Sequence, residues 1–224
     1  MNKEQFTIKE KVITLYHAEK ENAPMIVLST FTGDGESVYE AMKKIDCPDC
    51  NFVVVGELNW DHDMTPWYAP PLAPGDTPCT GGADEYLPVL TEEILPEAKK
   101  RIRGTPEFVG ITGYSLGGLF AVYAAYKTDA FDRVSSMSGS LWFPEFKEFC
   151  RTHEMKKVPD RMYLSLGDKE TKTRNPVLKT VQDNTEELTE YFKSLGIEVT
   201  YELNPGNHFR APALRSAKGV RGIL

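Results

Sequence analysis

The segment from residue 108 to residue 125, FVGITGYSLGGLFAVYAA, restricts the possible fold of this chain more than any other feature. An apolar, β-rich run, FVGIT, leads into GYSLG, and a continuous helical run follows. A G-x-S-x-G sequence between a strand and a helix holds its serine on a sharp, strained turn at the carboxyl end of the strand. The flanking glycines let strand and helix approach closely. The segment therefore predicts a strand–turn–helix unit that exposes the hydroxyl of Ser115.

Strand-like and helix-like segments alternate from residue 25 onward. Strands are expected at 25–30, 51–57, 108–112, 133–139, 161–167 and 197–204, after one or two opening strands at 6–17. Helices are expected at 37–45, 84–103, 116–127, 143–153, 177–196 and 212–224. This alternation predicts the α/β class, with a mostly parallel central sheet and helices on both faces. A length of 224 residues fits a single domain over 1–224.

Three local features refine this outline. Asp84 is expected to cap the 84–103 helix, and Pro96 to kink or end it. Gly196 closes the 177–196 helix, at a position where a residue in the left-handed conformation commonly ends a helix. The segment 58–83 is rich in Pro, Gly and aromatic residues, and a loop of that length inside a compact domain is usually functional or disordered.

Composition narrows the choice of partners and compartment. The net charge of −7 argues against nucleic acid and against an anionic membrane surface. The amino terminus has no apolar signal-peptide core, and no stretch has the length of a membrane span, so a cytoplasmic protein is expected. Cys47 and Cys50 precede a strand and lack the partners of a zinc site, so two reduced thiols are expected there. We expect no metal and no cofactor.

An activated serine needs a base, and the chain has four histidines: His17, His62, His153 and His208. In enzymes that carry such a serine turn, an acid and then a histidine follow the serine, each after a strand. His153 and His208 follow Ser115 in the sequence. Of these two, His208 lies in the turn NPGNHF directly after a strand, so we expect it to be the base.

The acid is expected in the loop after the preceding strand, where Asp168 and Glu170 are both candidates. Either carboxylate could accept the Nδ1 proton of the imidazole and hold its tautomer. An oxyanion hole needs two donors. One is expected to be the backbone amide of Leu116, and the other the amide of Phe31 or Thr32 in the loop after the 25–30 strand.

Further segments give the chain a family resemblance. GYSLGGLFAVYAA, MSGSLWF with Ser140 and Trp142, LSLGDKE…RNPVL, GNHF and TPWYAPP…GGADEYL…EEILP span nearly the whole chain. Together they resemble the esterases grouped with esterase D, feruloyl esterase domains and enterochelin (siderophore) esterases, which belong to the α/β-hydrolase superfamily. The resemblance implies an α/β-hydrolase fold, Ser115 as nucleophile and His208 as base.

The resemblance also bears on the acid and the oxyanion loop. Related feruloyl esterases have the acid three residues after the strand-ending glycine. That position is Glu170 here, counted from Gly167, so Glu170 is favoured over Asp168. Phe31 stands where many relatives have glycine, which is a departure from the family pattern.

These features lead to an expected activity on a small-molecule ester. The chain is expected to hydrolyse carboxylic esters through an acyl-enzyme at Ser115. The alternatives are enterochelin-type trilactone hydrolysis, acyl transfer or thioester hydrolysis on the same fold. A binding module without activity is disfavoured because both Ser115 and His208 are present. The oligomeric state stays open.

The space around the serine is expected to be open. One helix is expected between the 134–138 and 161–166 strands, which leaves no room for a large lid domain. The aromatic residues that could flank the site and stack on an acyl or sugar group are Trp60, Trp67, Tyr68 and Trp142, with His62 as a further candidate on the substrate side.

Overall fold

The computed structural model describes residues 3–224 and is built around an eight-stranded sheet. Its strands are β1 (Lys3–Ile8), β2 (Lys11–Tyr16), β3 (Met25–Ser29), β4 (Asn51–Gly56), β7 (Val109–Tyr114), β8 (Arg133–Met137), β9 (Arg161–Gly167) and β10 (Glu198–Asn204). Their order across the sheet is β1-β2-β4-β3-β7-β8-β9-β10. β2 pairs antiparallel with both β1 and β4, and the six strands β4, β3, β7, β8, β9 and β10 run parallel to one another. The predicted, mostly parallel sheet is confirmed.

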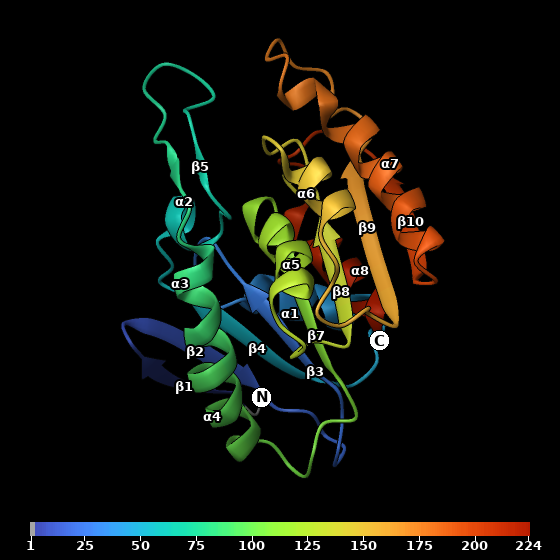
Figure 1. Cartoon of the computed structure of the whole chain (residues 1–224). Helices are drawn as coiled ribbons and strands as arrows, with labels where there is room; N and C mark the ends of the chain where they lie inside the picture. The colour runs from blue at the N-terminus through green and yellow to red at the C-terminus, as the bar shows by residue number, and fades with distance from the viewer. Residues whose placement is uncertain (1–2) are drawn as a thin grey trace.

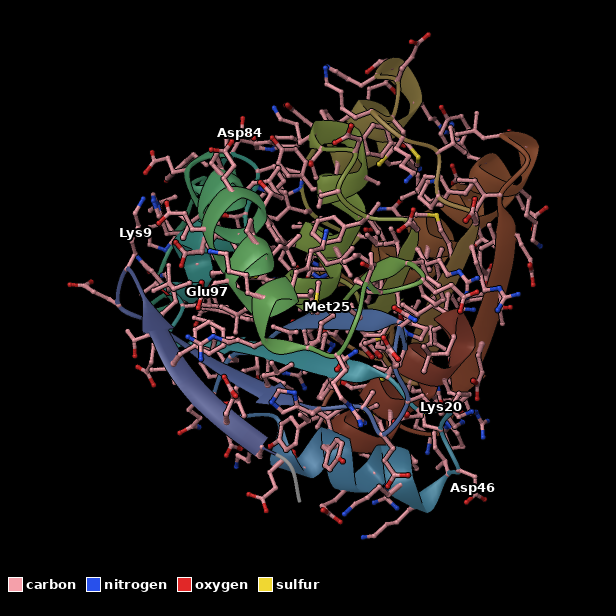
Figure 2. The ribbon with its side chains drawn as sticks, turned by 90° about the horizontal axis from the view of Figure 1, so that it is seen from below. Lys9, Lys20, Met25, Asp46, Asp84 and Glu97 are labelled. Carbon is pink, nitrogen blue, oxygen red and sulfur yellow. The ribbon has the colours of Figure 1, made fainter. Side chains whose placement is uncertain are left out.

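Helices cover both faces of this sheet. They are α1 (Glu36–Lys44), α2 (Trp60–Asp63), α3 (Ala83–Pro88), α4 (Leu95–Arg101), α5 (Leu116–Lys127), α6 (Phe146–Thr152), α7 (Val181–Ser194) and α8 (Pro212–Ile223). Figure 1 shows α5, α6 and α7 in front of the parallel strands and α1 and α8 behind them. From below, α1 and α4 lie on opposite sides of the sheet (Figure 2). Within the described chain, α6 is the one helix between β8 and β9.

Alternation along the central strands sorts their side chains into two cores. In β3, Met25 and Val27 contact the core under α3 to α7, whereas Ile26 and Leu28 face the core under α1 and α8. Successive strand residues point to opposite faces, so a strand covered on both sides is apolar throughout. Helix α5 is buried from Leu116 to Tyr126, which explains why it is apolar all round.

The helical segment at 84–103 differs from the expectation in two ways. Gly82, rather than Asp84, precedes the helix, and the Asp84 carboxylate instead accepts hydrogen bonds from Tyr123 and Lys127. Pro96 neither ends nor breaks the helical path, because a π-helical stretch, Val89–Ile94, runs into α4 directly before it. A widened turn accommodates the proline, which has no N–H to donate.

The segment 58–83 is more ordered than a plain loop. It contains α2 and a short hairpin of β5 (Tyr68–Ala69) and β6 (Cys79–Thr80). Figure 1 shows this segment (teal) projecting beyond the carboxyl ends of the parallel strands. At 177–196, a 3₁₀ turn, Leu178–Thr180, leads into α7, and Gly196 follows that helix with φ of +85°. The prediction for Gly196 is confirmed.

The cysteines lie apart from any ligand cluster. Burial raises the pKa of the Cys47 thiol to about 11 and that of Cys50 well above its ordinary value, and both are free. Within residues 3–224, no three His, Cys, Asp or Glu side chains gather as metal ligands would. No helix in that same range combines the length and the apolar character needed to cross a membrane.

Candidate active site

Ser115 occupies the turn between β7 and α5 in a strained conformation. Its φ and ψ are 58° and −124°, in a region that non-glycine residues rarely adopt. The chain crosses itself closely here, because a Cβ on Gly113 would overlap the carbonyl group of Gly117. The Ser115 amide donates to the carbonyl oxygen of Met137 at 3.1 Å, and its carbonyl oxygen accepts from the amide of Ser140 at 3.1 Å. The turn is therefore fixed on both sides.

His208 lies between Ser115 and Glu170. Its Nε2 atom is 3.0 Å from Ser115 Oγ, and its Nδ1 atom is 2.9 Å from Glu170 Oε2. The register of the sheet explains this meeting: Asn204 at the end of β10 pairs with Gly167 at the end of β9. The loops that carry His208 and Glu170 therefore leave the sheet side by side.

Glu170 is held by more groups than His208 alone. Its side chain is 5% exposed, and its Oε1 atom accepts from Ser138 Oγ at 2.7 Å and from the Gly167 amide at 2.6 Å. Burial acts to raise the pKa of Glu170. The hydrogen bonds from His208, Ser138 and the Gly167 amide outweigh burial, so the pKa is lowered and the carboxylate stays ionised.

Asp168, the alternative acid, lies elsewhere in the same loop. It is exposed, and its Oδ1 atom accepts from the backbone amide of Gly206 at 2.7 Å. That contact ties together the loops after β9 and β10. Asp168 therefore supports the loop that carries His208, whereas Glu170 contacts the imidazole.

Sequence reasoning missed Arg215. This residue on α8 is 2% exposed, and its Nη1 atom lies 3.1 Å from Glu170 Oε1. Its Nη2 atom donates to the carbonyl oxygens of Pro205 and Asn207, at 3.2 and 3.1 Å, on the loop before His208. One guanidinium therefore holds both loops. The available signal was an arginine within the small-residue run PALRSAKG, on the face of α8 that the sheet must bury.

The expected oxyanion donors border the serine. Leu116 follows Ser115 at the start of α5, and Phe31 and Thr32 line a cavity beside Ser115. Within the described chain, the amides of these three residues donate to no other residue. Amides without an internal partner, at the start of a helix and in an adjacent loop, suit a developing negative charge.

Two cavities meet at Ser115. The first, of about 430 Å³, lies between the loop after β3 and the start of α8 and includes Phe31, His208 and Phe209. The second, of about 730 Å³, lies under the 58–83 segment and includes Asp61, Ser140, Trp142 and Asn175. Trp60 lines both cavities and contacts Phe31 edge to face, with ring centroids 5.4 Å apart.

The other expected substrate residues do not line either cavity. Trp67 packs among Phe143, Phe146 and Phe149, and its indole N–H donates to the carbonyl oxygen of Pro144. Tyr68 is 64% exposed on the short hairpin. His62 on α2 contacts Thr80 of β6 and Glu85 of α3. These three side chains line neither cavity, and the sequence alone does not show that.

The remaining histidines lie outside the site. His17 contacts Glu4 at 3.3 Å near the antiparallel edge of the sheet. His153 stacks on Phe149 at the end of α6, with ring centroids 4.4 Å apart.

Comparison with known proteins identifies the family. Residues 29–212 match the family model described as "Putative esterase". The chain belongs to this esterase family. A protein from Bacillus subtilis (strain 168), "Uncharacterized protein YbbA", is 25% identical to the esterase over 171 residues, which are 75% of this chain and 68% of the other.

Solved structures share the fold at low sequence identity. The siderophore hydrolase EstB of Aspergillus nidulans is 20% identical, with a TM-score of 0.75 over 98% of this chain and 93% of the other. The BES protein of Bacillus cereus is 21% identical, with a TM-score of 0.75 over 99% and 96% of the two chains. An IroE-like serine hydrolase of Shewanella oneidensis is 19% identical, with a TM-score of 0.77 over 98% and 78%. The family match makes the chain a carboxylic ester hydrolase, and these structures show that it shares the fold of such hydrolases.

Proposed function

We propose that this protein is a serine esterase that acts through a covalent acyl-enzyme at Ser115. The observation that carries the proposal is the position of His208, whose two ring nitrogens face Ser115 Oγ at 3.0 Å and Glu170 Oε2 at 2.9 Å. A serine hydroxyl needs a base within hydrogen-bond reach, and the base needs a partner that fixes its tautomer. This arrangement meets both requirements.

The proposed reaction has two halves. In the first, Ser115 Oγ attacks the ester carbonyl while His208 Nε2 takes the hydroxyl proton. His208 then returns that proton to the leaving alcohol as the carbon–oxygen bond breaks. In the second, a water molecule attacks the acyl-enzyme, with His208 again as base, and releases the acid. Glu170 accepts the Nδ1 proton throughout, because its lowered pKa keeps it ionised.

The amides of Leu116 and of Phe31 or Thr32 are the proposed donors to the tetrahedral oxyanion. Leu116 begins α5, so the helix dipole adds to its amide. Since the donors are backbone groups, Phe31 can stand where many relatives have glycine. Its ring contacts Trp60 edge to face.

A second candidate is hydrolysis of a siderophore ester. Several structural neighbours favour it, for example the siderophore hydrolase EstB of Aspergillus nidulans and the enterobactin esterase of Shigella flexneri. Acyl transfer to an added alcohol or thiol uses the same acyl-enzyme. Product analysis with and without such an acceptor separates transfer from hydrolysis.

The proposed function is tested by labelling and turnover together. A fluorophosphonate probe should modify Ser115, as located by peptide mass spectrometry, and 4-nitrophenyl acetate should be hydrolysed. Prior labelling should abolish that hydrolysis. A protein that releases no nitrophenol and takes up no probe, while its circular dichroism is that of a folded α/β protein, would refute the proposal.

A further inference from the structure

The two cavities that meet at Ser115 differ in the groups that surround them. The first is bordered by apolar side chains, among them Phe31, Phe209 and Val38, and carries His208. The lining of the second is mostly apolar as well and includes Trp142, but of the two cavities only the second is bordered by carboxylates, those of Asp61 and Asp76. An ester has two parts, and the two cavities offer them different chemistry.

The position of His208 orients the ester. Because His208 must return a proton to the leaving oxygen, the alcohol part has to leave on the side of the imidazole. His208 and its neighbour Phe209 line the first cavity and do not line the second. The alcohol part therefore belongs in the first cavity, and the acyl part, bonded to Ser115, extends under Trp60 into the second.

The charged residues that line the cavities limit the charge that the acyl part can carry. Among residues 3–224, no lysine or arginine lines either cavity, so nothing there neutralises an anionic substrate. Asp61 is partly buried, and its Oδ2 atom accepts from Thr77 Oγ1 at 2.6 Å. The carboxylates of Asp61 and Asp76 would repel a negative charge on the acyl part, whereas they would accept hydrogen bonds from an ammonium or hydroxyl group on it.

The second cavity has walls from two distant parts of the chain. The side-chain amide of Asn175 in the segment after β9 donates to the carbonyl oxygen of Leu72 in the 58–83 segment, at 2.9 Å. Trp60 and Trp142 provide aromatic surfaces on which an extended acyl group can lie. This bond joins the two segments that project beyond the strands in Figure 1 (teal and orange).

We infer that the substrate is an ester whose acyl part is either uncharged or cationic, bound between Trp60, Trp142 and Asp61, and whose alcohol part is apolar. This inference rests on the proposed function, because it assigns the two parts of the ester that Ser115 attacks to the two cavities. In acylation the bond from Ser115 Oγ to the carbonyl carbon forms and the bond to the alcohol oxygen breaks. The proton passes from the serine through His208 to that oxygen.

A series of esters with one leaving group and different acyl charges tests the inference. The probes are 4-nitrophenyl esters of 4-(trimethylammonio)butanoate, 4-hydroxybutanoate and hemiglutarate, with 4-nitrophenyl acetate as the reference. We expect kcat/KM for the cationic ester to exceed that for the anionic ester by about tenfold or more at low salt, since two partly exposed carboxylates each contribute a few-fold. The ratio should fall as ionic strength rises.

The double variant Asp61→Asn/Asp76→Asn isolates the carboxylates. It should bring the cationic and anionic esters to within about twofold of each other, with each rate taken relative to that of 4-nitrophenyl acetate in the same variant. The matched control is Asp183→Asn, at an exposed aspartate on α7 that lines neither cavity, and this variant should keep the full preference. An equal or higher rate for the anionic ester in the unmodified protein would overturn the inference. Failure to hydrolyse 4-nitrophenyl acetate would instead refute the proposed function.

The assignment of the two cavities has its own test, because deacylation occurs after the alcohol has left. Stopped-flow measurements on a common acyl group separate the burst of nitrophenol from the steady state. Trp142→Ala should change the deacylation rate constant. Phe209→Ala, at a side chain that is 83% exposed, should change the burst rate constant and leave deacylation unchanged. The opposite pattern would show that the acyl and alcohol parts occupy the other cavities.

Discussion

The two sides of Ser115 differ in how firmly their groups are held. On the imidazole side, Glu170 accepts three hydrogen bonds at one oxygen and faces His208 with the other, and Arg215 joins this cluster to the loop before His208. On the opposite side, the amides of Leu116 and Phe31 donate to no other residue of the described chain. The groups proposed to transfer protons are preorganised, and the amides proposed to meet the substrate are left free. Under the proposed function, chemistry and specificity therefore depend on different parts of the molecule.

The largest expected effect comes from the residue between the two sides. Ser115→Ala removes the nucleophile and should lower kcat for 4-nitrophenyl acetate by about 10⁶-fold, as loss of a triad nucleophile does in a serine protease. Initial rates with purified protein measure this loss of kcat. The variant should also resist fluorophosphonate labelling. A rate near that of the unmodified protein would mean that another group attacks the ester.

A change at Glu170 tests the imidazole side of Ser115, which is the preorganised side. Glu170→Gln keeps the shape of the side chain but no longer offers a carboxylate to His208 Nδ1, so kcat should fall by about 10⁴-fold. Asp168→Asn is the control on the same loop and should cost less than about tenfold, because an amide oxygen can still accept from Gly206. If Asp168→Asn is the damaging change, the roles are reversed. If both are nearly silent, Ser115 and His208 work as a pair.

Substitution of Arg215 tests whether the positions of Glu170 and His208 matter for the rate, as well as which residues they are. Arg215→Met should lower kcat by about 10²-fold through misplacement of the loops that carry Glu170 and His208. KM for 4-nitrophenyl acetate should change by less than about twofold, because Arg215 lines neither cavity at Ser115. Arg215→Lys should restore part of the lost kcat. Loss of stability with kcat unchanged would assign Arg215 a structural role only.

The sequence allows the preorganised side to be predicted because its main groups follow strands. Ser115, Glu170 and His208 come directly after β7, β9 and β10, and parallel strands bring their carboxyl ends to one edge of the sheet. The choice of Glu170 over Asp168 depended on the family resemblance. From the residues alone, both carboxylates fitted the loop.

The rest depends on contacts that the sequence pattern does not encode. Arg215 reaches Glu170 from a helix 45 residues later, and only the packing of α8 on the sheet brings them together. The positions of Trp67, Tyr68 and His62 depend on the local fold of the 58–83 segment, which has no periodicity but contains α2 and a short hairpin. The helical path through Pro96 depends on a π-helical stretch, which hydrophobic spacing does not reveal.

The smallest expected effect concerns stability against pH. The pKa of Glu170 is lower in the folded protein than its ordinary value, so its ionised form stabilises the fold. This contribution is fully present above the unfolded pKa, about 4.3, and is lost as the pH falls through the folded value.

Glu170→Gln has no such group. The free energy of unfolding of the unmodified protein should therefore exceed that of the variant by a constant amount from pH 6 to 8, and by less as the pH falls below about 4.3. Urea titrations at each pH measure the difference. Glu187→Gln, at an exposed carboxylate paired with Lys147, is the control and should show a much smaller pH-dependent difference, because solvent screens that pair. A difference for Glu170→Gln that widens in acid would mean that Glu170 is protonated in the folded protein. In that case it donates to His208 instead of accepting from it, and the preorganised side would no longer hold the imidazole in the tautomer that a base requires.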